Sequence, residues 1–327
     1  MSLALLFPGQ GSQFIGMGKD FSSKFTVANQ LFSDLDQILG RSLTEIMFDG
    51  NIDELTLTTN SQPAIMAVSS VILESIRSEN LINFDSVEAV AGHSLGEYSA
   101  LYAANSISFI SSIQLLEVRS RAMQESMPVG TGGMVAIIGK SMLEVEDLLD
   151  SIKDYGQISI ANDNADGQVV VSGEMSAINH LCDNSKELGV KRALKLPVSA
   201  PFHCDLIQSA SEELSKVINK YEFDEFKYDF YSNVTSEQCS NIETPDLLVR
   251  QIVSRVRWRE IVENMIKNGI STFIEVGPGN VLSNLVKRIN KSSNTLSISK
   301  VEDLEKLNTI APVSYTHLQP TRLSTIS

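Results

Sequence analysis

The chain is poor in the features that mark disulfide-rich, membrane-spanning and secreted proteins. Only three of its 327 residues are cysteines, and Cys182, Cys204 and Cys239 are spaced neither as metal ligands nor as disulfide partners. No apolar run reaches the roughly eighteen residues that a bilayer requires, and the first residues lack the positive start of a signal peptide. The sequence therefore predicts a cytoplasmic protein that keeps its thiols reduced.

Positive charge is also scarce. Lysine and arginine number 26 against 40 aspartates and glutamates, which gives a formal net charge of −14. Such a surface repels the phosphates of nucleic acids and of anionic membranes, so we expect neither as a partner. A hydrophobic content of 43% is ordinary for a globular protein, and 327 residues suffice for two lobes.

Short apolar runs alternate with helical patterns along most of the chain, which is typical of an α/β fold with a parallel sheet. Strands are expected at 3–7, 87–91, 228–233 and 272–276. A helix is expected to begin near Pro63, because a proline in the first helical turn leaves no hydrogen bond unmade. Another helix is expected to run without a break from Pro245 to Lys267.

The pattern changes near Met134 to strand, helix, strand, strand, helix, strand, which is the order of a ferredoxin-like βαββαβ unit. We therefore expect an α/β-hydrolase-like catalytic lobe formed by residues 1–130 and 199–310, with a ferredoxin-like lobe, 131–198, inserted into it. Residues 311–327 have no amphipathic period. We expect them to be a non-native or disordered tail that can be removed without loss of activity.

The sequence Gly92-His93-Ser94-Leu95-Gly96 stands between the 87–91 strand and a helical pattern. This layout is typical of a nucleophile elbow, in which a serine lies at the tip of a sharp strand-to-helix turn. Glycine is needed at both ends because a Cβ there would collide with the neighbouring strand or helix. Ser94 is therefore the candidate nucleophile.

A serine nucleophile needs a general base, and the chain has four histidines. His93 shares the elbow with Ser94, and adjacent side chains diverge on a sharp turn, so we interpret it as structural. His180 lies in the polar part of a small-lobe helix, and His317 belongs to the tail. His203 lies where the chain returns from the small lobe to the main sheet, a place where a cleft forms, and is the predicted base.

No aspartate or glutamate has a sequence position that identifies it as the third member of a catalytic triad. Asp205 is too close in sequence to orient His203, and Asp163 and Asp166 lie in the small lobe. The α/β-hydrolases place their acid between the serine and a histidine near the C-terminus, whereas here more than a hundred residues follow His203. Two possibilities stay open: a backbone carbonyl orients the imidazole, or the acid lies elsewhere.

Several short strings, taken together and in order, are similar to one protein family. They are Phe7-Pro8-Gly9-Gln10-Gly11-Ser12-Gln13, Thr59-Asn60-Ser61-Gln62-Pro63-Ala64, Gly92-His93-Ser94-Leu95-Gly96-Glu97-Tyr98, Glu117-Val118-Arg119, Ala200-Pro201-Phe202-His203, Val249-Arg250-Gln251 and Glu275-Val276-Gly277-Pro278-Gly279. With this set the chain resembles the malonyl-CoA:acyl carrier protein transacylases of bacterial fatty acid synthesis, from about Leu3 to Lys291. An inserted ferredoxin-like lobe is also the architecture of that family.

The resemblance implies a role for each matching residue. Ser94 attacks the malonyl thioester and becomes a malonyl ester, while His203 accepts its proton and later activates the phosphopantetheine thiol, in a ping-pong reaction. The backbone N–H groups of Gln10 and Leu95 form the oxyanion hole. The third triad member is replaced by a main-chain carbonyl, which matches Gln251 here.

The resemblance also implies how malonyl is selected. Arg119 holds the free carboxylate of the substrate, since a guanidinium offers two parallel donors. Gln62 matches a second substrate-binding position, and Phe202 matches members in which a bulky ring crowds an α-methyl group. From the residues alone, the alternative is that Arg119 is an exposed helix arginine like Arg121.

The implied partners are malonyl-CoA and an acyl carrier protein, with no metal or further cofactor, and we expect a monomer. Acyl carrier proteins are acidic, so docking needs a local basic patch. Candidates are Lys186, Lys191 and Arg192 in the small lobe, and Lys287, Arg288 and Lys291 near the last helix. The second group has an alternative interpretation, in which these charges only favour the C-terminal end of a helix dipole.

Two other functions compete with malonyl transfer for fatty acid synthesis. One is a free-standing acyltransferase or acyl hydrolase of a polyketide system, built on the same fold. The other is an inactive scaffold that only binds carrier proteins. We disfavour the scaffold because Ser94, His203, Gln10 and Arg119 are all present.

Overall fold

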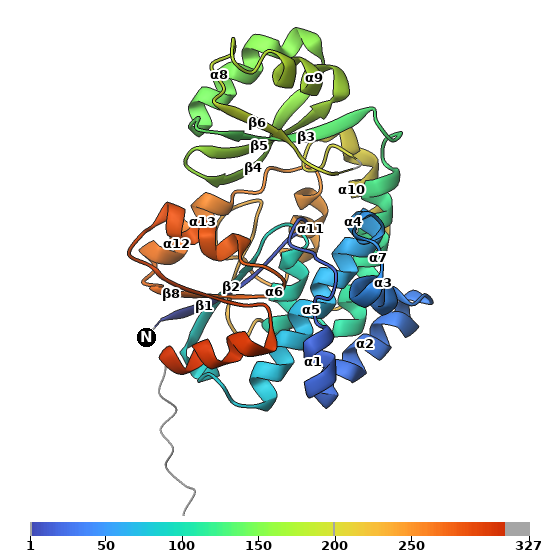
Figure 1. The fold of residues 1–327 in the computed structure, drawn as a ribbon, viewed down its shortest axis with the longest axis vertical. Helices are drawn as coiled ribbons and strands as arrows, with labels where there is room; N and C mark the ends of the chain where they lie inside the picture. The colour runs from blue at the N-terminus through green and yellow to red at the C-terminus, as the bar shows by residue number, and fades with distance from the viewer. Residues whose placement is uncertain (1, 199, 311–327) are drawn as a thin grey trace, which may run out of the picture.

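The computed structural model describes residues 2–198 and 200–310, so the predicted tail and His317 lie outside the described residues. Two separate sheets form the frame of the described chain. The larger has five parallel strands in the order β7-β2-β1-β8-β9, and the smaller has four antiparallel strands in the order β4-β5-β3-β6. Figure 1 shows the lobe with the smaller sheet at one end of the long axis and the larger lobe below it.

The parallel sheet places several loops at one edge, because all its strands end on the same side. Its strands are β1 (Leu3–Phe7), β2 (Val87–Gly92), β7 (Asp229–Tyr231), β8 (Thr272–Val276) and β9 (Asn294–Ile298). The predicted strands are present, although β7 is shorter than expected. The edge strand β9 was not predicted, since its sequence Asn-Thr-Leu-Ser-Ile carries little apolar pattern.

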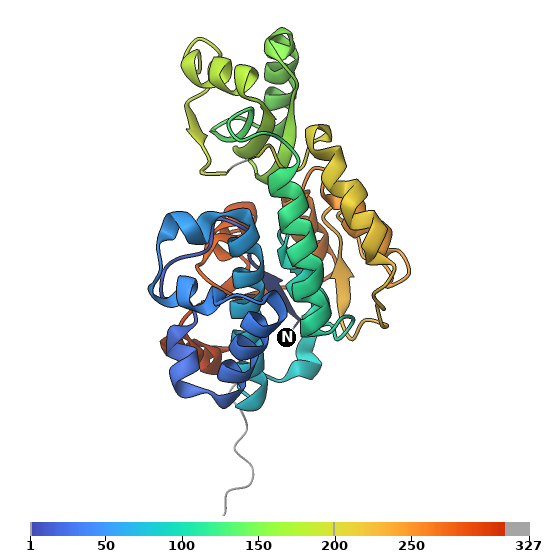
Figure 2. The same ribbon diagram turned by 90° about the vertical axis from the view of Figure 1, so that its right-hand side faces the viewer.

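Helices pack against this sheet and against one another. Those of the large lobe are α1 (Lys19–Lys24), α2 (Thr26–Leu39), α3 (Leu43–Asp49), α4 (Ile52–Thr56), α5 (Thr58–Ser78), α6 (Gly96–Ala103), α7 (Phe109–Glu125), α10 (Gln208–Ile218), α11 (Thr244–Gln251), α12 (Trp258–Lys267) and α13 (Val281–Ile289). Figure 2 shows α7 running up to the small lobe between the blue helices and α10. Among the described residues, no helix is long and apolar enough to cross a membrane.

The helix expected to begin near Pro63 begins earlier, at Thr58. Proline cannot donate a hydrogen bond, so Pro63 leaves the carbonyl of Thr59 without its helical partner. Arg41 takes that place, because its Nη2 donates to the Thr59 oxygen at 2.8 Å. A side chain distant in sequence therefore allows a proline inside the helix.

The prediction of one helix from Pro245 to Lys267 is wrong, because the chain forms α11 and α12 with a break between them. In the break, Val256 pairs with the small lobe: its N–H donates to Ala161 at 2.8 Å and its carbonyl accepts from Asp163 at 2.9 Å. These strand-like bonds replace the helical ones. The amphipathic pattern continues through the break, so it gave no sign of it.

The smaller sheet has the predicted ferredoxin-like order of strands and helices. It contains β3 (Gly132–Ile138), β4 (Ile158–Ala165), β5 (Gln168–Glu174) and β6 (Arg192–Lys195), with α8 (Met142–Ile152) and α9 (Met175–Asp183) on one face. The strands and these two helices enclose an apolar core of their own. Strand β4 lies nearest the large lobe, where buried Asp163 pairs with Arg259 at 2.8 Å. The α/β fold class with an inserted ferredoxin-like unit is confirmed.

Candidate active site

Ser94 lies at the turn between β2 and α6, in the layout of a nucleophile elbow. Its φ is 52°, a left-handed value that costs a residue with a Cβ some strain. A Cβ added to Gly92 would lie 1.8 Å from the carbonyl carbon of Gly96, and one added to Gly96 would lie 2.2 Å from the Phe7 oxygen. Both glycines are therefore required by the close approach of backbone to backbone.

His203 is in hydrogen-bond contact with Ser94. Its Nε2 lies 2.8 Å from the Ser94 hydroxyl oxygen, and its Nδ1 lies 2.9 Å from the backbone oxygen of Gln251. Because that carbonyl can only accept, Nδ1 carries the proton and Nε2 is free to take the hydroxyl proton. Of the two possibilities left open by the sequence, the structure thus places a backbone carbonyl, at the end of α11, beside the imidazole.

The surroundings of His203 keep it neutral. It is buried at 4% exposure, and its φ of 60° is again left-handed. Burial and the nearby charge of Arg119 lower the pKa of His203 to about 3. A neutral imidazole is the form that can accept a proton, so His203 is available as a base across the physiological pH range.

Arg119, on α7, is completely buried behind the nucleophile. Its Nη1 donates to the Gln62 side chain at 2.6 Å, and its Nη2 donates to the Ser94 hydroxyl at 3.0 Å and to the Gln251 side chain at 2.8 Å. The alternative interpretation as an exposed helix arginine is therefore wrong. Arg121 does have that character, since it is 59% exposed and pairs with a glutamate four residues earlier.

The candidate donors of the oxyanion hole are the backbone N–H groups of Gln10 and Leu95. Gln10 follows β1 and lines the cavity beside Ser94, and Leu95 is the residue that precedes α6. Neither N–H makes a hydrogen bond to another described residue. Gly9 allows the loop to approach the elbow, because a Cβ there would lie 2.6 Å from the backbone oxygen of His93.

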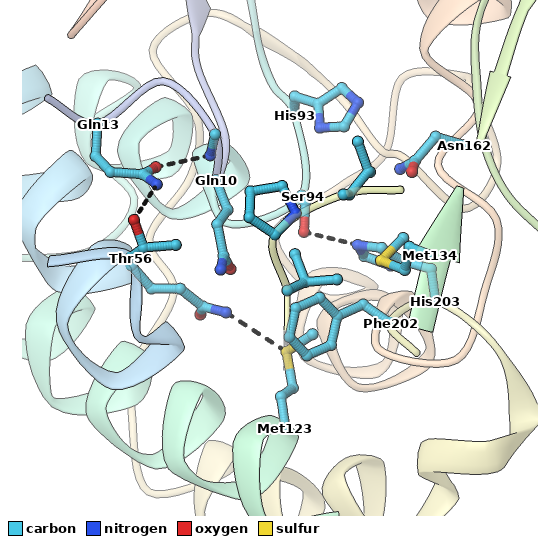
Figure 3. A pocket seen from close by; sticks show the side chains of 15 residues that line it. Gln10, Gln13, Thr56, His93, Ser94, Met123, Met134, Asn162, Phe202 and His203 are labelled. Carbon is cyan, nitrogen blue, oxygen red and sulfur yellow. Dashed lines mark hydrogen bonds between the residues drawn. The ribbon is translucent and has the colours of Figure 1, made fainter. Parts of the chain in front are cut away.

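A cavity of about 150 Å³ opens in front of Ser94 and His203 (Figure 3). The large lobe contributes Gln10, Gln62 and Phe202, among others, and the small lobe and its connection contribute Met134, Asn162, Leu196, Pro197 and Val198. Figure 3 shows Ser94 pointing to His203, with Phe202 and Met123 on the wall nearby. The acyl group of a substrate would thus be enclosed by both lobes.

Two residues of the site had no role in the sequence prediction. Glu97, on the first turn of α6, is fully buried, and its two carboxylate oxygens accept from the backbone N–H of Asn233 and from the side-chain nitrogen of Gln251. Asn233 in turn accepts from the Ser94 N–H at 2.7 Å and donates to the Gly92 oxygen at 2.7 Å. Glu97 is the only charged residue of α6, which was a signal for it, whereas nothing in the sequence marked Asn233.

The other two described histidines do not hydrogen-bond to the dyad of Ser94 and His203. The ring of His93 contacts Asn164 of the small lobe at 2.9 Å, in keeping with a structural role. His180 stacks on Tyr155 in the small lobe. Residues 2–198 and 200–310 contain no group of three or more His, Cys, Asp or Glu side chains that could hold a metal ion.

Comparisons with known proteins show the family to which the chain belongs. Residues 4–313 match the family described as the acyl transferase domain. A malonyl CoA-acyl carrier protein transacylase of Bacillus subtilis (strain 168) is 38% identical over 305 residues, which is 93% of this chain and 95% of that protein. An acyl-carrier-protein-S-malonyltransferase from Bartonella henselae has a crystal structure that matches with a TM-score of 0.91 at 40% identity, over 95% of this chain and 99% of that one.

A second solved structure that this chain resembles contains a bound carrier protein. It is a malonyl-transacylase in complex with a type II PKS acyl-carrier protein, and it matches with a TM-score of 0.91 at 35% identity. The match covers 95% of this chain and 100% of the other.

Proposed function

This chain belongs to the acyl transferase family, and from that premise we propose how its site moves a malonyl group from malonyl-CoA to an acyl carrier protein. The function is that of an acyl-carrier-protein S-malonyltransferase. The observation that carries the proposed mechanism is the chain of contacts from the Gln251 carbonyl through His203 to Ser94, beside a buried arginine. It supplies a nucleophile, a neutral base and a charge for the substrate carboxylate.

In the first half-reaction Ser94 Oγ attacks the thioester carbonyl while His203 Nε2 takes the hydroxyl proton. The C–S bond breaks, coenzyme A leaves with that proton, and malonyl-Ser94 remains. In the second half His203 takes the proton of the phosphopantetheine thiol, the sulfur attacks the ester, and the proton returns to Ser94. The N–H groups of Gln10 and Leu95 stabilise the oxyanion in both halves. No cofactor enters this route.

The malonyl carboxylate is proposed to bind Arg119. The guanidinium already donates to the Ser94 hydroxyl, so an acyl group on Ser94 begins within its reach. Its Nε has no hydrogen-bond partner among the described residues, which leaves a buried donor available for a carboxylate. Gln62 holds the other end of the guanidinium, and Phe202 narrows the cavity against α-branched acyl groups.

The carrier protein is proposed to dock on exposed basic residues of the small lobe. Lys186, Lys191 and Arg192 are exposed on the small lobe and fit this role. On α13, Lys287 donates to the backbone oxygen of Ser293 at 2.5 Å and Arg288 to Gln168 at 2.7 Å, which supports a structural role for that group. The protein is proposed to act as a monomer in the cytoplasm, without nucleic acid partners, and to supply fatty acid synthesis.

Incubation with radiolabelled malonyl-CoA tests the proposal. We expect label on the protein in the absence of a carrier, and quantitative passage of that label to a supplied holo acyl carrier protein. Release as free malonate, faster than transfer, would instead indicate the hydrolase of the alternative reading. Failure of any label to bind the protein would exclude the acyl-enzyme route.

A further inference from the structure

The side chain of Gln251 joins groups that the proposed reaction uses separately. Its amide oxygen accepts from Arg119 at 2.8 Å, while its Nε2 donates to the backbone oxygen of Ser94 at 3.0 Å and to the carboxylate of Glu97. Its backbone oxygen accepts the hydrogen bond of the His203 Nδ1–H, as described above. Gln251 and Glu97 are both fully buried, so water does not replace these partners.

The direction of this amide is set by its neighbours. Arg119 can only donate and the Ser94 carbonyl can only accept, so the amide oxygen must face Arg119 and the amide nitrogen must face Ser94. Glu97 strengthens the same choice, because it accepts from that nitrogen while its other oxygen accepts from Asn233. Burial raises the pKa of Glu97, and these two N–H donors together with the charge of Arg119 oppose the rise.

We propose that Glu97 and the side-chain amide of Gln251 are positioning residues for malonyl selection, which hold the Arg119 guanidinium against the acyl group on Ser94. The inference rests on the proposed role of Arg119 as the donor to the malonyl carboxylate. All polar side-chain atoms of both residues already bond to protein partners, whereas Arg119 Nε has none among the described residues, so both residues act through Arg119 and not by touching the substrate. Gln251 then orients the base His203 through its backbone oxygen and positions Arg119 for malonyl selection through its side chain.

The variant Gln251→Met isolates the side chain. It removes the amide bonds, keeps the backbone oxygen beside His203 and changes no charge. In a one-tube competition between malonyl-CoA and acetyl-CoA, we expect the ratio of their kcat/KM values to fall about tenfold or more, as for a lost hydrogen bond to a buried charge. Because the two substrates compete for the same folded enzyme molecules, this ratio does not depend on the fraction of enzyme that is folded.

The variant Glu97→Gln tests the carboxylate by the sign of its effect. Burial raises the pKa of Glu97 to about 8, so the carboxyl is largely protonated at neutral pH and the exchange changes little charge near Arg119. Any negative charge that it does remove would strengthen the attraction of Arg119 for malonyl, so only lost positioning can lower the malonyl-to-acetyl ratio. We expect the ratio to fall. The matched control is Glu275→Gln, since Glu275 is equally buried but accepts from the N–H groups of Leu282 and Ser283 at the start of α13. It should leave the ratio unchanged.

Repeating both changes in an Arg119→Ala background separates this inference from the proposed function. There, Gln251→Met should alter the ratio by less than about twofold, because the residue through which it acts is gone. If Arg119→Ala alone leaves the ratio intact, the proposed role of Arg119 fails. If Arg119→Ala collapses the ratio while Gln251→Met preserves it, or Glu97→Gln raises it, that role stands and the positioning role is overturned.

Discussion

The two lobes differ in where they place backbone strain. In the described part of the small lobe, 131–198, every residue with a left-handed φ is a glycine: Gly139, Gly156, Gly167 and Gly189. The described part of the large lobe holds five residues other than glycine in that region, namely Asn80, Ser94, Asn105, His203 and Ser236. Strain of this kind persists only where surrounding structure enforces it, and two of the five, Ser94 and His203 with φ values of 52° and 60°, are the residues proposed to exchange a proton.

The interiors of the two lobes also differ, in how many interacting polar side chains they bury. The core of the small lobe is apolar, built from residues such as Val135, Ile137 and Val171. The large lobe buries Glu97, Arg119 and Gln251 completely and connects them by hydrogen bonds around the elbow. The large lobe thus holds the proposed reacting groups in a buried network of hydrogen bonds. The small lobe folds around an apolar core and contributes residues such as Met134 and Asn162 to the cavity wall.

The largest effect should come from removing the nucleophile. Ser94→Ala should reduce transfer by about 10⁴-fold or more and abolish malonyl labelling, because the acyl acceptor is gone, while malonyl-CoA still binds. Radiolabelling and calorimetry measure the two quantities. Ser172→Ala, which changes a buried serine of the small lobe, is the control and should label normally. Normal turnover by Ser94→Ala would remove the elbow from the mechanism.

Removing the base should have the next largest effect. We expect His203→Ala to slow both half-reactions by about 10²- to 10⁴-fold, because neither the hydroxyl nor the thiol is then deprotonated as it attacks. Stopped-flow rates of acylation and deacylation measure this, with His180→Ala of the small lobe as the control. Unaltered rates in both halves would point to another base.

A pH series should show the cost of keeping His203 neutral. Its pKa in the folded protein is lowered to about 3 from an unfolded value of 6.5, so the unfolded chain binds the extra proton first as pH falls. The stability that His203 contributes is therefore present above pH 6.5 and is lost as pH falls toward about 3. We expect thermal unfolding of His203→Asn to depend less on pH across this window than that of the wild type. An equal dependence would show that His203 is not buried as a neutral ring.

The smallest effect should come from the core of the small lobe. Ile137→Val removes one buried methyl group and should cost about 0.5–1.5 kcal/mol of unfolding free energy. Thermal and denaturant unfolding measure that cost. Because this lobe only encloses the cavity, kcat/KM of the folded variant for malonyl-CoA should stay within about twofold of the wild-type value. A larger loss of activity than of stability would break the division of labour between the lobes.

Much of this arrangement follows from the sequence because its determinants are local. The elbow could be predicted from two glycines whose need is steric, and the strand at Leu3–Phe7 from an unbroken apolar run. The break between α11 and α12 could not, because it depends on bonds from Val256 to residues almost a hundred positions away. Asn233 was missed for the same reason, since its contact with Ser94 spans 139 positions.

The central claim is that Arg119 selects malonyl for attachment to Ser94. The most direct test is to mix the enzyme with equal amounts of malonyl-CoA and acetyl-CoA, quench the reaction early, and measure by mass spectrometry which acyl group the Ser94 peptide carries. The wild type should carry malonyl almost alone. Arg119→Ala should shift the product ratio toward acetyl by about 10²- to 10³-fold, since a carboxylate left without its buried partner costs about 2–5 kcal/mol and acetyl has none to lose. Arg121→Ala, on the same helix, should behave as the wild type. An unchanged ratio in Arg119→Ala, or an acyl group on another residue, would contradict the claim.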